Sequence, residues 1–143
     1  MRSYLVVGNQ TLDSSDLAEA IRERMAAEPA SFHVVVPATP ISHGLTWDED
    51  EAREAAGERL TETLARLRDA GVEASGEIGA RDPIEATVDA LRGRELDEVF
   101  LSTLPPGISR WLGQDVPTRL KGSIQVPVTV VTTQRESVST TRS

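Results

Sequence analysis

The chain has 143 residues and a formal net charge of −8, with 38% hydrophobic and 27% charged residues, which is typical of one folded domain with its own core. The acidic balance and an aromatic content of 3% argue against a nucleic-acid-binding surface and against anionic membranes. Cysteine is absent, and no apolar run approaches the roughly 18 residues of a membrane span, so we expect a cytoplasmic protein without disulfides or a signal peptide.

The first predicted elements are a strand, a helix and a second strand. Residues 4–7 are a continuous apolar run, as expected of a strand covered on both faces. A polar cap segment at 13–16 opens a helix whose apolar residues recur at helical spacing, and Pro29 ends it. Residues 32–36 form the second apolar run, which a proline closes.

A long helix, an outer strand and a short helix follow. A capping-box sequence at 46–49 opens the long helix, which ends in a glycine. Residues 72–79 alternate loosely, which suits an edge strand with one wetter face. Another capping box at 82–85 opens the short helix. The buried stripe expected for this helix is Ile84, Val88 and Leu91.

The last third of the chain carries a strand, a loop, a helical segment and a final strand. Residues 99–101 are the strand, and a pair of hydroxyl residues at 102–103 follows it. Within the helical segment 108–122, Asp115 is predicted to cap a fresh helix start before a proline. Residues 126–131 form the last apolar run.

Strands that alternate with helices predict an α/β domain with a parallel sheet and helices on both of its faces. This three-layer α/β/α domain is expected to span residues 1–131. The tail at 132–143 is rich in Ser, Thr and Arg and has little to bury, so we expect it to be disordered.

Three stretches of the chain, at 82–87, 98–102 and 125–131, resemble the universal stress protein family. The resemblance extends from the first strand to Val131 and is most specific in the C-terminal third. It implies a Rossmann-like five-stranded parallel sheet in the order 3-2-1-4-5. It also implies a homodimer through the last strand, here Val126–Val131, whose apolar edge would otherwise be free.

In that strand order the sheet reverses between strands 1 and 4, and a ligand crevice is expected at the carboxyl ends of the strands there. Residues that follow strands 1, 2 and 4 would line it. These candidates are Gly8, Asn9, Gln10, Pro37, Ala38, Thr39, Ser102, Thr103, Gly107, Arg110, Gln114 and Asp115.

In nucleotide-binding relatives, a glycine-rich segment after strand 4 holds the ATP phosphates. The family pattern is Gly, two residues, Gly, nine residues, Gly and then Ser or Thr. The corresponding positions here are Leu101, Leu104, Gln114 and Asp115. Side chains replace the glycines that let backbone N–H groups approach phosphate, and the aspartate repels it. The sequence therefore predicts that ATP is not bound in the family manner, with ATP binding through a remodelled loop as the alternative.

Several candidates have a structural alternative to ligand binding. Ser102 and Thr103 either bind a ligand or satisfy the backbone at the strand end. Asn9 either reads a polar ligand or fixes the turn after strand 1. Arg110 is either a ligand contact or a solvated charge, and Trp111 is either a core or dimer-contact aromatic or a stacking platform.

Residue patterns typical of catalysis are missing from the sequence. His33 falls within a strand and is expected to be packed, while His43 falls in a loop without acidic residues at metal-ligand spacing. No Gly-x-Ser-x-Gly elbow is present. We therefore hypothesise a non-catalytic, universal-stress-like regulatory module without a metal or a certain cofactor. The alternatives are a nucleotide-binding member that holds ATP or AMP and an enzyme on another doubly wound scaffold.

Overall fold

The computed structural model describes residues 1–38, 49–104, 111 and 115–133. Strands and helices alternate along the chain, as the sequence predicts. The elements are β1 (Arg2–Val7), α1 (Ser15–Ala27), β2 (Ala30–Pro37), α2 (Glu49–Asp69), β3 (Glu73–Gly79), α3 (Pro83–Leu91), β4 (Glu98–Thr103), α5 (Val116–Ser123) and β5 (Val128–Thr132).

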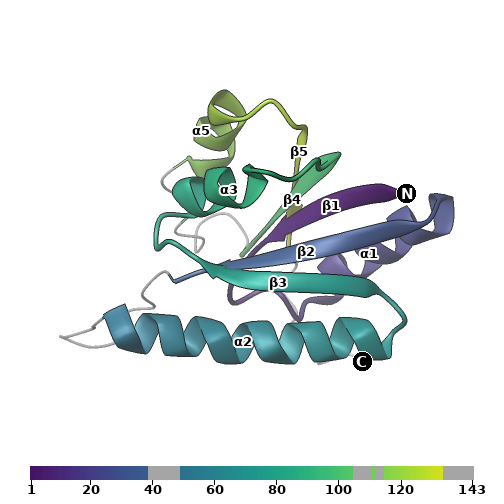
Figure 1. Ribbon diagram of the computed structural model, residues 1–143, viewed down its shortest axis with the longest axis horizontal. Helices are drawn as coiled ribbons and strands as arrows, with labels where there is room; N and C mark the ends of the chain where they lie inside the picture. The colour runs from purple at the N-terminus through teal and green to yellow at the C-terminus, as the bar shows by residue number, and fades with distance from the viewer. Residues whose placement is uncertain (39–48, 105–110, 112–114, 134–143) are drawn as a thin grey trace.

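All five strands run parallel in one sheet, in the order β3-β2-β1-β4-β5. The predicted fold class and strand order are confirmed. Helices α1 and α2 lie on one face of the sheet, and α3 and α5 lie on the other (Figure 1).

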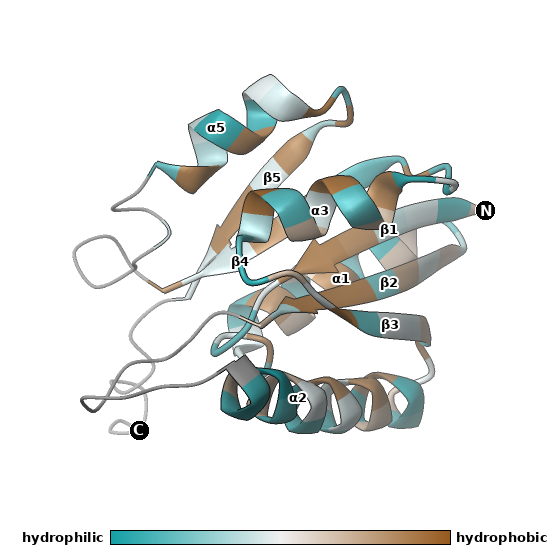
Figure 2. Cartoon of the chain, turned by 60° about the vertical axis from the view of Figure 1, so that its left-hand side comes forward, coloured by the Kyte–Doolittle hydropathy of each residue, from teal (hydrophilic) through white to brown (hydrophobic). Residues whose placement is uncertain are grey.

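Alternating side chains on the strands build a separate core on each face of the sheet. On β1, Tyr4 and Val6 pack towards α1 and α2, whereas Leu5 and Val7 pack towards α3 and α5. This is the period-two pattern of a strand covered on both sides, and it explains why the run is apolar throughout. The hydrophobic colours are concentrated on the central strands, whereas much of the edge strand β3 is teal (Figure 2).

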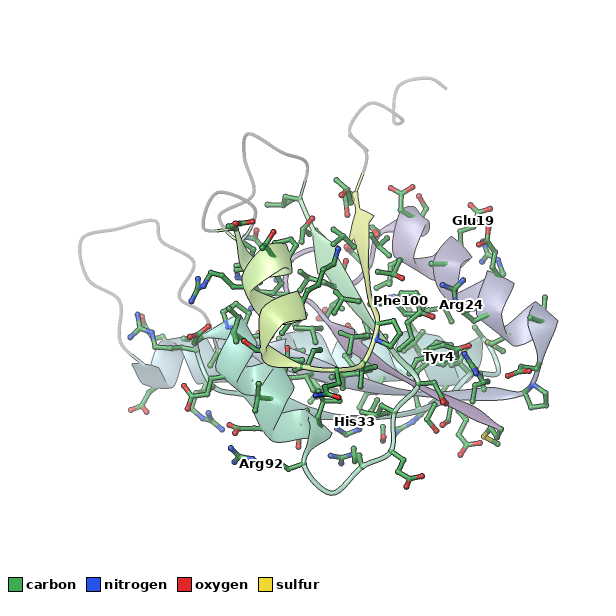
Figure 3. All side chains as sticks on the ribbon, turned by 90° about the horizontal axis from the view of Figure 1, so that it is seen from above. Tyr4, Glu19, Arg24, His33, Arg92 and Phe100 are labelled. Carbon is green, nitrogen blue, oxygen red and sulfur yellow. The ribbon has the colours of Figure 1, made fainter. Side chains whose placement is uncertain are left out.

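Three aromatic rings form a stack in the core on the α1 side. The ring of Tyr4 lies between Phe32, at a centroid distance of 5.1 Å, and Phe100, at 5.6 Å. The guanidinium of Arg24 on α1 lies 5.0 Å from the centroid of the Phe100 ring (Figure 3). The cation–π contact between Arg24 and Phe100 adds to the ring stacking and stabilises the packing of α1 against the centre of the sheet.

Two helix starts have the caps that the sequence predicts. The Ser14 hydroxyl accepts a hydrogen bond from the Leu17 N–H at 3.1 Å, and the Asp82 carboxylate accepts one from Ile84 at 2.9 Å. Gly71, after α2, has φ +84°, the left-handed conformation in which a helix C-terminus favours glycine. The predicted capping box of α2 falls mostly outside the described residues.

The buried stripe of α3 differs from the prediction. Ile84, Val88 and Leu91 are only partly buried. The residues that face the sheet fully are Pro83, Ala86, Thr87 and Ala90. The helix packs so closely that a Cβ added to Gly79 of β3 would lie 2.6 Å from the Ala86 Cβ, so small residues occupy the contact and the larger ones flank it.

The last strand is displaced towards the C-terminus relative to the prediction. β5 begins at Val128 and includes Thr132, because Val126 and Pro127 belong to the approach to the strand. Thr133 also joins the sheet, donating its N–H to the carbonyl of Thr103 at 2.9 Å. The remainder of the predicted tail, 134–143, lies outside the described residues. In the part of the chain that is described, no helix has the length and apolar character to cross a bilayer.

Candidate functional site

The carboxyl ends of β1 and β4 meet at the point where the strand order reverses. β1 lies between β2 and β4, and the helices that follow β1 and β4 cover opposite faces of the sheet. In open α/β sheets, a crevice at this position is the usual ligand site. Among the described candidates, Gly8, Asn9, Pro37, Ala38, Ser102 and Thr103 lie at the carboxyl ends of these neighbouring strands.

Gly8 follows β1 at the position expected for the crevice and lies directly against β4. A Cβ built on Gly8 would lie 2.8 Å from Cδ2 of Leu12 and 3.1 Å from the Ser102 Cβ. The glycine therefore permits close approach of the two strand ends, and the buried side chain of Leu12 occupies the space beside it. This part of the crevice is filled by the chain itself.

The hydroxyl of Ser102 is paired inside the protein. Its Oγ lies 2.5 Å from Oγ1 of Thr11, and the two residues are 1% and 5% exposed. Of the two roles that the sequence allows for Ser102, the described contacts match the structural one. Thr11 was not among the sequence candidates, although it follows Asn9 and Gln10 directly in the segment after the first strand.

Asn9 joins the ends of β1 and β2. Its side-chain Nδ2 donates a hydrogen bond to the Pro37 carbonyl at 2.9 Å. Its backbone carbonyl accepts a hydrogen bond from the Leu12 N–H in the turn. Ala38 is buried and continues the ladder by donating to the Gly79 carbonyl at 3.1 Å. Gln10 is exposed and takes no part in these bonds.

Two hydroxyls near the carboxyl end of β4 have no hydrogen-bond partner among the described residues. They belong to Thr103 and Thr133, which are 2% and 9% exposed. Thr103 shares the α3-side face of β4 with Leu101, whereas Ser102 faces the other side with Thr11. Buried hydroxyls are normally paired, so these two retain hydrogen-bonding capacity. The sequence analysis assigned Thr133 to the disordered tail. Its place beside β4 is shown only by the hydrogen bond from its N–H to the Thr103 carbonyl.

Asp115 does not cap α5 in the predicted way. Its backbone is left-handed, with φ +58° and ψ +39°, and its side chain makes no cap hydrogen bond. The left-handed region strongly favours glycine over residues with a Cβ. An exposed carboxylate consequently stands at the start of α5, where a helix N-terminus would otherwise favour an incoming anion.

Two of the three positions aligned with the family glycines, Leu101 and Leu104, are among the described residues. Leu101 is fully buried within β4, and Leu104 is half-buried. Trp111 belongs to the core on the α3 side together with Val116, so it is a core aromatic. The candidates Thr39, Gly107, Arg110 and Gln114 lie outside the described residues. Within the described ranges, no group of three or more His, Asp or Glu side chains is arranged to hold a metal ion.

No family model matches the sequence, and no curated protein does so either. Solved structures do match the fold. A universal stress protein family structure from Burkholderia pseudomallei aligns with a TM-score of 0.65 at 19% identity, covering 90% of this chain and 94% of that one. The Archaeoglobus fulgidus universal stress protein in complex with dAMP gives a TM-score of 0.64 at 16% identity, over 92% and 98% of the two chains.

A universal stress protein family protein from Arabidopsis thaliana with AMP bound aligns with a TM-score of 0.65 at 12% identity, over 96% of this chain and 95% of that one. The alignments span nearly all of each chain, so the similarity concerns the whole domain. The resemblance drawn from the sequence is confirmed at this level: the chain has the fold of the universal stress proteins.

Proposed function

We propose that this chain is a non-catalytic regulatory module of the universal stress type, and that it does not bind ATP in the family manner. The observation that carries the proposal is that polar groups at the carboxyl ends of β1 and β4 are already hydrogen-bonded within the protein. Ser102 is bonded to Thr11, and the Asn9 amide is bonded to the end of β2. A nucleotide that uses these groups would have to break their hydrogen bonds, one buried and one partly buried, before forming its own, which weakens binding.

The charge at the start of α5 supports the same proposal. Phosphate groups bind helix N-termini because free N–H groups and the helix dipole favour negative charge. Here the exposed carboxylate of Asp115 stands at that position. The formal net charge of −8 adds a general repulsion of polyphosphates.

Nucleotide binding through a rebuilt crevice is the alternative, and a specific observation favours it. The hydroxyls of Thr103 and Thr133 are buried without a partner among the described residues, and hydroxyls bind phosphate or ribose oxygens well. The matching structures from Archaeoglobus fulgidus and Arabidopsis thaliana contain dAMP and AMP.

Mass analysis of the small molecules released from gently purified, then denatured protein separates the two proposals. The regulatory module without bound nucleotide is expected to release no adenine nucleotide. Stoichiometric AMP or ATP from the wild type, lost from a folded Thr103→Val variant, would establish the alternative. Thr118→Val on the exposed surface of α5 is the matched control, because it removes a threonine hydroxyl outside the crevice.

We also propose that two copies of the chain associate through β5, in the cytoplasm. The apolar strand β5 forms one edge of the sheet, whereas the opposite edge, β3, carries Glu73 and Glu77. Charged side chains protect an edge from pairing, and apolar edges invite it. Val126, Val128 and Val130 are only partly buried in the single chain, so a second copy would complete their burial.

The hydrogen bonds of β5 suggest a sharp test of this dimer. The Pro127 carbonyl and the Thr133 N–H both bond to β4, so by alternation the backbone groups of Val130 face the free edge. Val130→Pro therefore removes a donor from the outer edge only. Sedimentation should show a dimer for the wild type and for Val130→Thr, and a folded monomer for Val130→Pro. A wild-type monomer at micromolar concentration would contradict the proposal.

A further inference from the structure

A cavity with polar lining residues lies at the amino ends of the strands, opposite the expected crevice. It has a volume of about 330 Å³ and is lined by residues that begin β1, β2 and β3, including Ser3, Ser31 and Glu73. α3 has nine residues and ends at Leu91, and the turn that follows it supplies the opposite wall at 94–96. The cavity size is near the lower limit of small-molecule sites.

His33 is the buried polar group of this cavity. It is 7% exposed, and its Nδ1 lies 2.7 Å from the Ser75 hydroxyl. Its Nε2 makes no hydrogen bond among the described residues, and it lies 3.6 Å from a carboxylate oxygen of Glu77, a contact that becomes an ion pair only when the imidazole is protonated. In the neutral ring this buried nitrogen lacks a hydrogen bond, which is costly, and a ligand would satisfy it.

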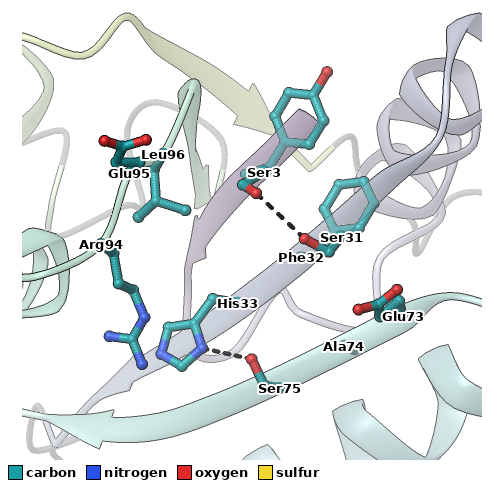
Figure 4. Close-up of a pocket in the computed structure, with 11 residues that line it drawn as sticks. Ser3, Ser31, Phe32, His33, Glu73, Ala74, Ser75, Arg94, Glu95 and Leu96 are labelled. Atoms are coloured by element: carbon teal, nitrogen blue, oxygen red, sulfur yellow. Dashed lines mark hydrogen bonds between the residues drawn. The ribbon is translucent and has the colours of Figure 1, made fainter. Parts of the chain in front are cut away.

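Arg94 extends into the same cavity beside His33 (Figure 4). Its one described hydrogen bond, from Nη1 to the Ala90 carbonyl at 3.2 Å, uses one of the five N–H donors of a guanidinium. Burial lowers the pKa of His33 below its usual value, and the charge of Arg94 lowers it further, while Glu77 opposes both. An anion placed between imidazole and guanidinium would accept a hydrogen bond from each, and its negative charge would counteract the effect of Arg94 on the pKa of His33.

Charges at the rim limit the anion to a small one. Glu73 and Glu95 line the cavity and are exposed, so a polyphosphate or a dicarboxylate would meet like charges. The hydroxyls of Ser3 and Ser31, 3.4 Å apart, offer donors and acceptors to the remainder of a ligand (Figure 4). We propose that this cavity binds a small monocarboxylate, preferably one with a hydroxyl group, with its carboxylate between Arg94 and His33.

Titration of the ¹⁵N-labelled full chain with sodium lactate tests this inference. Saturable shifts are expected at the amides of the cavity residues, together with a rise in the pKa of His33, because a bound carboxylate favours the imidazolium. Lactamide, which has the same shape without the charge, should give no saturable shift. Sodium chloride at equal ionic strength controls for screening.

Two arginine variants give the experiment a matched control. Arg94→Gln should weaken lactate binding about tenfold, as expected for the loss of a charge-assisted hydrogen bond. Arg92→Gln should leave it unchanged, because Arg92 is not among the residues that line the cavity and pairs with Asp89 at 3.1 Å. Absence of saturable shifts, equal binding of lactamide, unaltered affinity in Arg94→Gln, or tighter binding of inorganic phosphate would each overturn the proposal. The outcome is independent of nucleotide binding in the crevice.

Discussion

Arg24 on α1 and Glu98 at the start of β4 form a two-point ion pair, with Nε–Oε1 at 3.2 Å and Nη2–Oε2 at 3.0 Å. Thr129 of β5 donates a further hydrogen bond to the same carboxylate. The guanidinium also covers the ring of Phe100. One helix, a central strand and the edge strand are thereby tied together in a partly buried cluster.

This pair predicts an acid-sensitive contribution to stability. Burial alone would raise the pKa of Glu98, but the hydrogen bonds from Arg24 and Thr129 hold it below its usual value. A carboxyl with a depressed folded pKa stabilises the fold above its unfolded pKa of about 4.3, and this contribution is lost as the pH falls through the folded pKa. Arg24→Met should therefore lower the free energy of unfolding by roughly 1–3 kcal/mol at neutral pH.

Urea unfolding at neutral pH and at about pH 3, below the unfolded pKa of a glutamate, measures this effect. The difference between Arg24→Met and the wild type should shrink in acid. Arg92→Met removes an exposed pair with Asp89 and should change stability little. A loss in Arg24→Met that stays constant with pH would show that the ion pair is not its source.

Gly79 should not tolerate a side chain. A Cβ there would lie 2.6 Å from that of Ala86 and 2.9 Å from Cγ1 of Val35. Gly79→Ala is expected to cost about 1–3 kcal/mol by overpacking. Gly122→Ala, on α5 where an added Cβ meets nothing within 4 Å, is expected to stabilise by up to about 1 kcal/mol. Thermal or urea unfolding of both variants provides the check, and equal effects would refute the close α3–sheet contact.

Residue patterns predict the topology of this chain much better than they predict its crevice. Apolar runs and helical spacings are local, and parallel strands joined by helices admit few arrangements. The bond between Thr11 and Ser102 joins residues 91 positions apart, and nothing in either local pattern indicates it. The spacing in α3 suggested the larger apolar residues as the buried stripe, but the approach allowed by Gly79 brings Ala86 to the contact instead.

The hydroxyl pair in the crevice should be energetically coupled. Ser102→Ala leaves the Thr11 hydroxyl buried without its partner, which should cost about 1–3 kcal/mol. Thr11→Val should cost less, because the Ser102 hydroxyl keeps a long hydrogen bond of 3.5 Å to the backbone carbonyl of residue 11. The double variant should lose less than the sum of the two, because no unpaired hydroxyl remains. Equilibrium unfolding of the four proteins measures the coupling, and strict additivity would show that the two hydroxyls do not interact.

The charge of Arg94 should be visible in the titration of His33. Because burial and Arg94 lower the folded pKa of His33 while Glu77 raises it, the unfolded chain takes up the proton first. Stability should therefore fall as the pH drops below the unfolded value of about 6.5. In Arg94→Gln the pKa of His33, followed by NMR, should rise. The loss of stability below the unfolded pKa should then become smaller. Arg92→Gln is expected to leave the pKa where it is; a shift of equal size there would exclude a local effect of Arg94.

Calorimetric titration of nucleotide-free protein with ATP tests the central claim most directly. The internal bonding of Ser102 and Asn9 and the carboxylate at the start of α5 predict no saturable heat from the wild type at millimolar ATP. Micromolar binding by the wild type that is weakened in a folded Thr103→Val variant and kept in Thr118→Val would contradict the account and show that a nucleotide is bound at this end of the sheet.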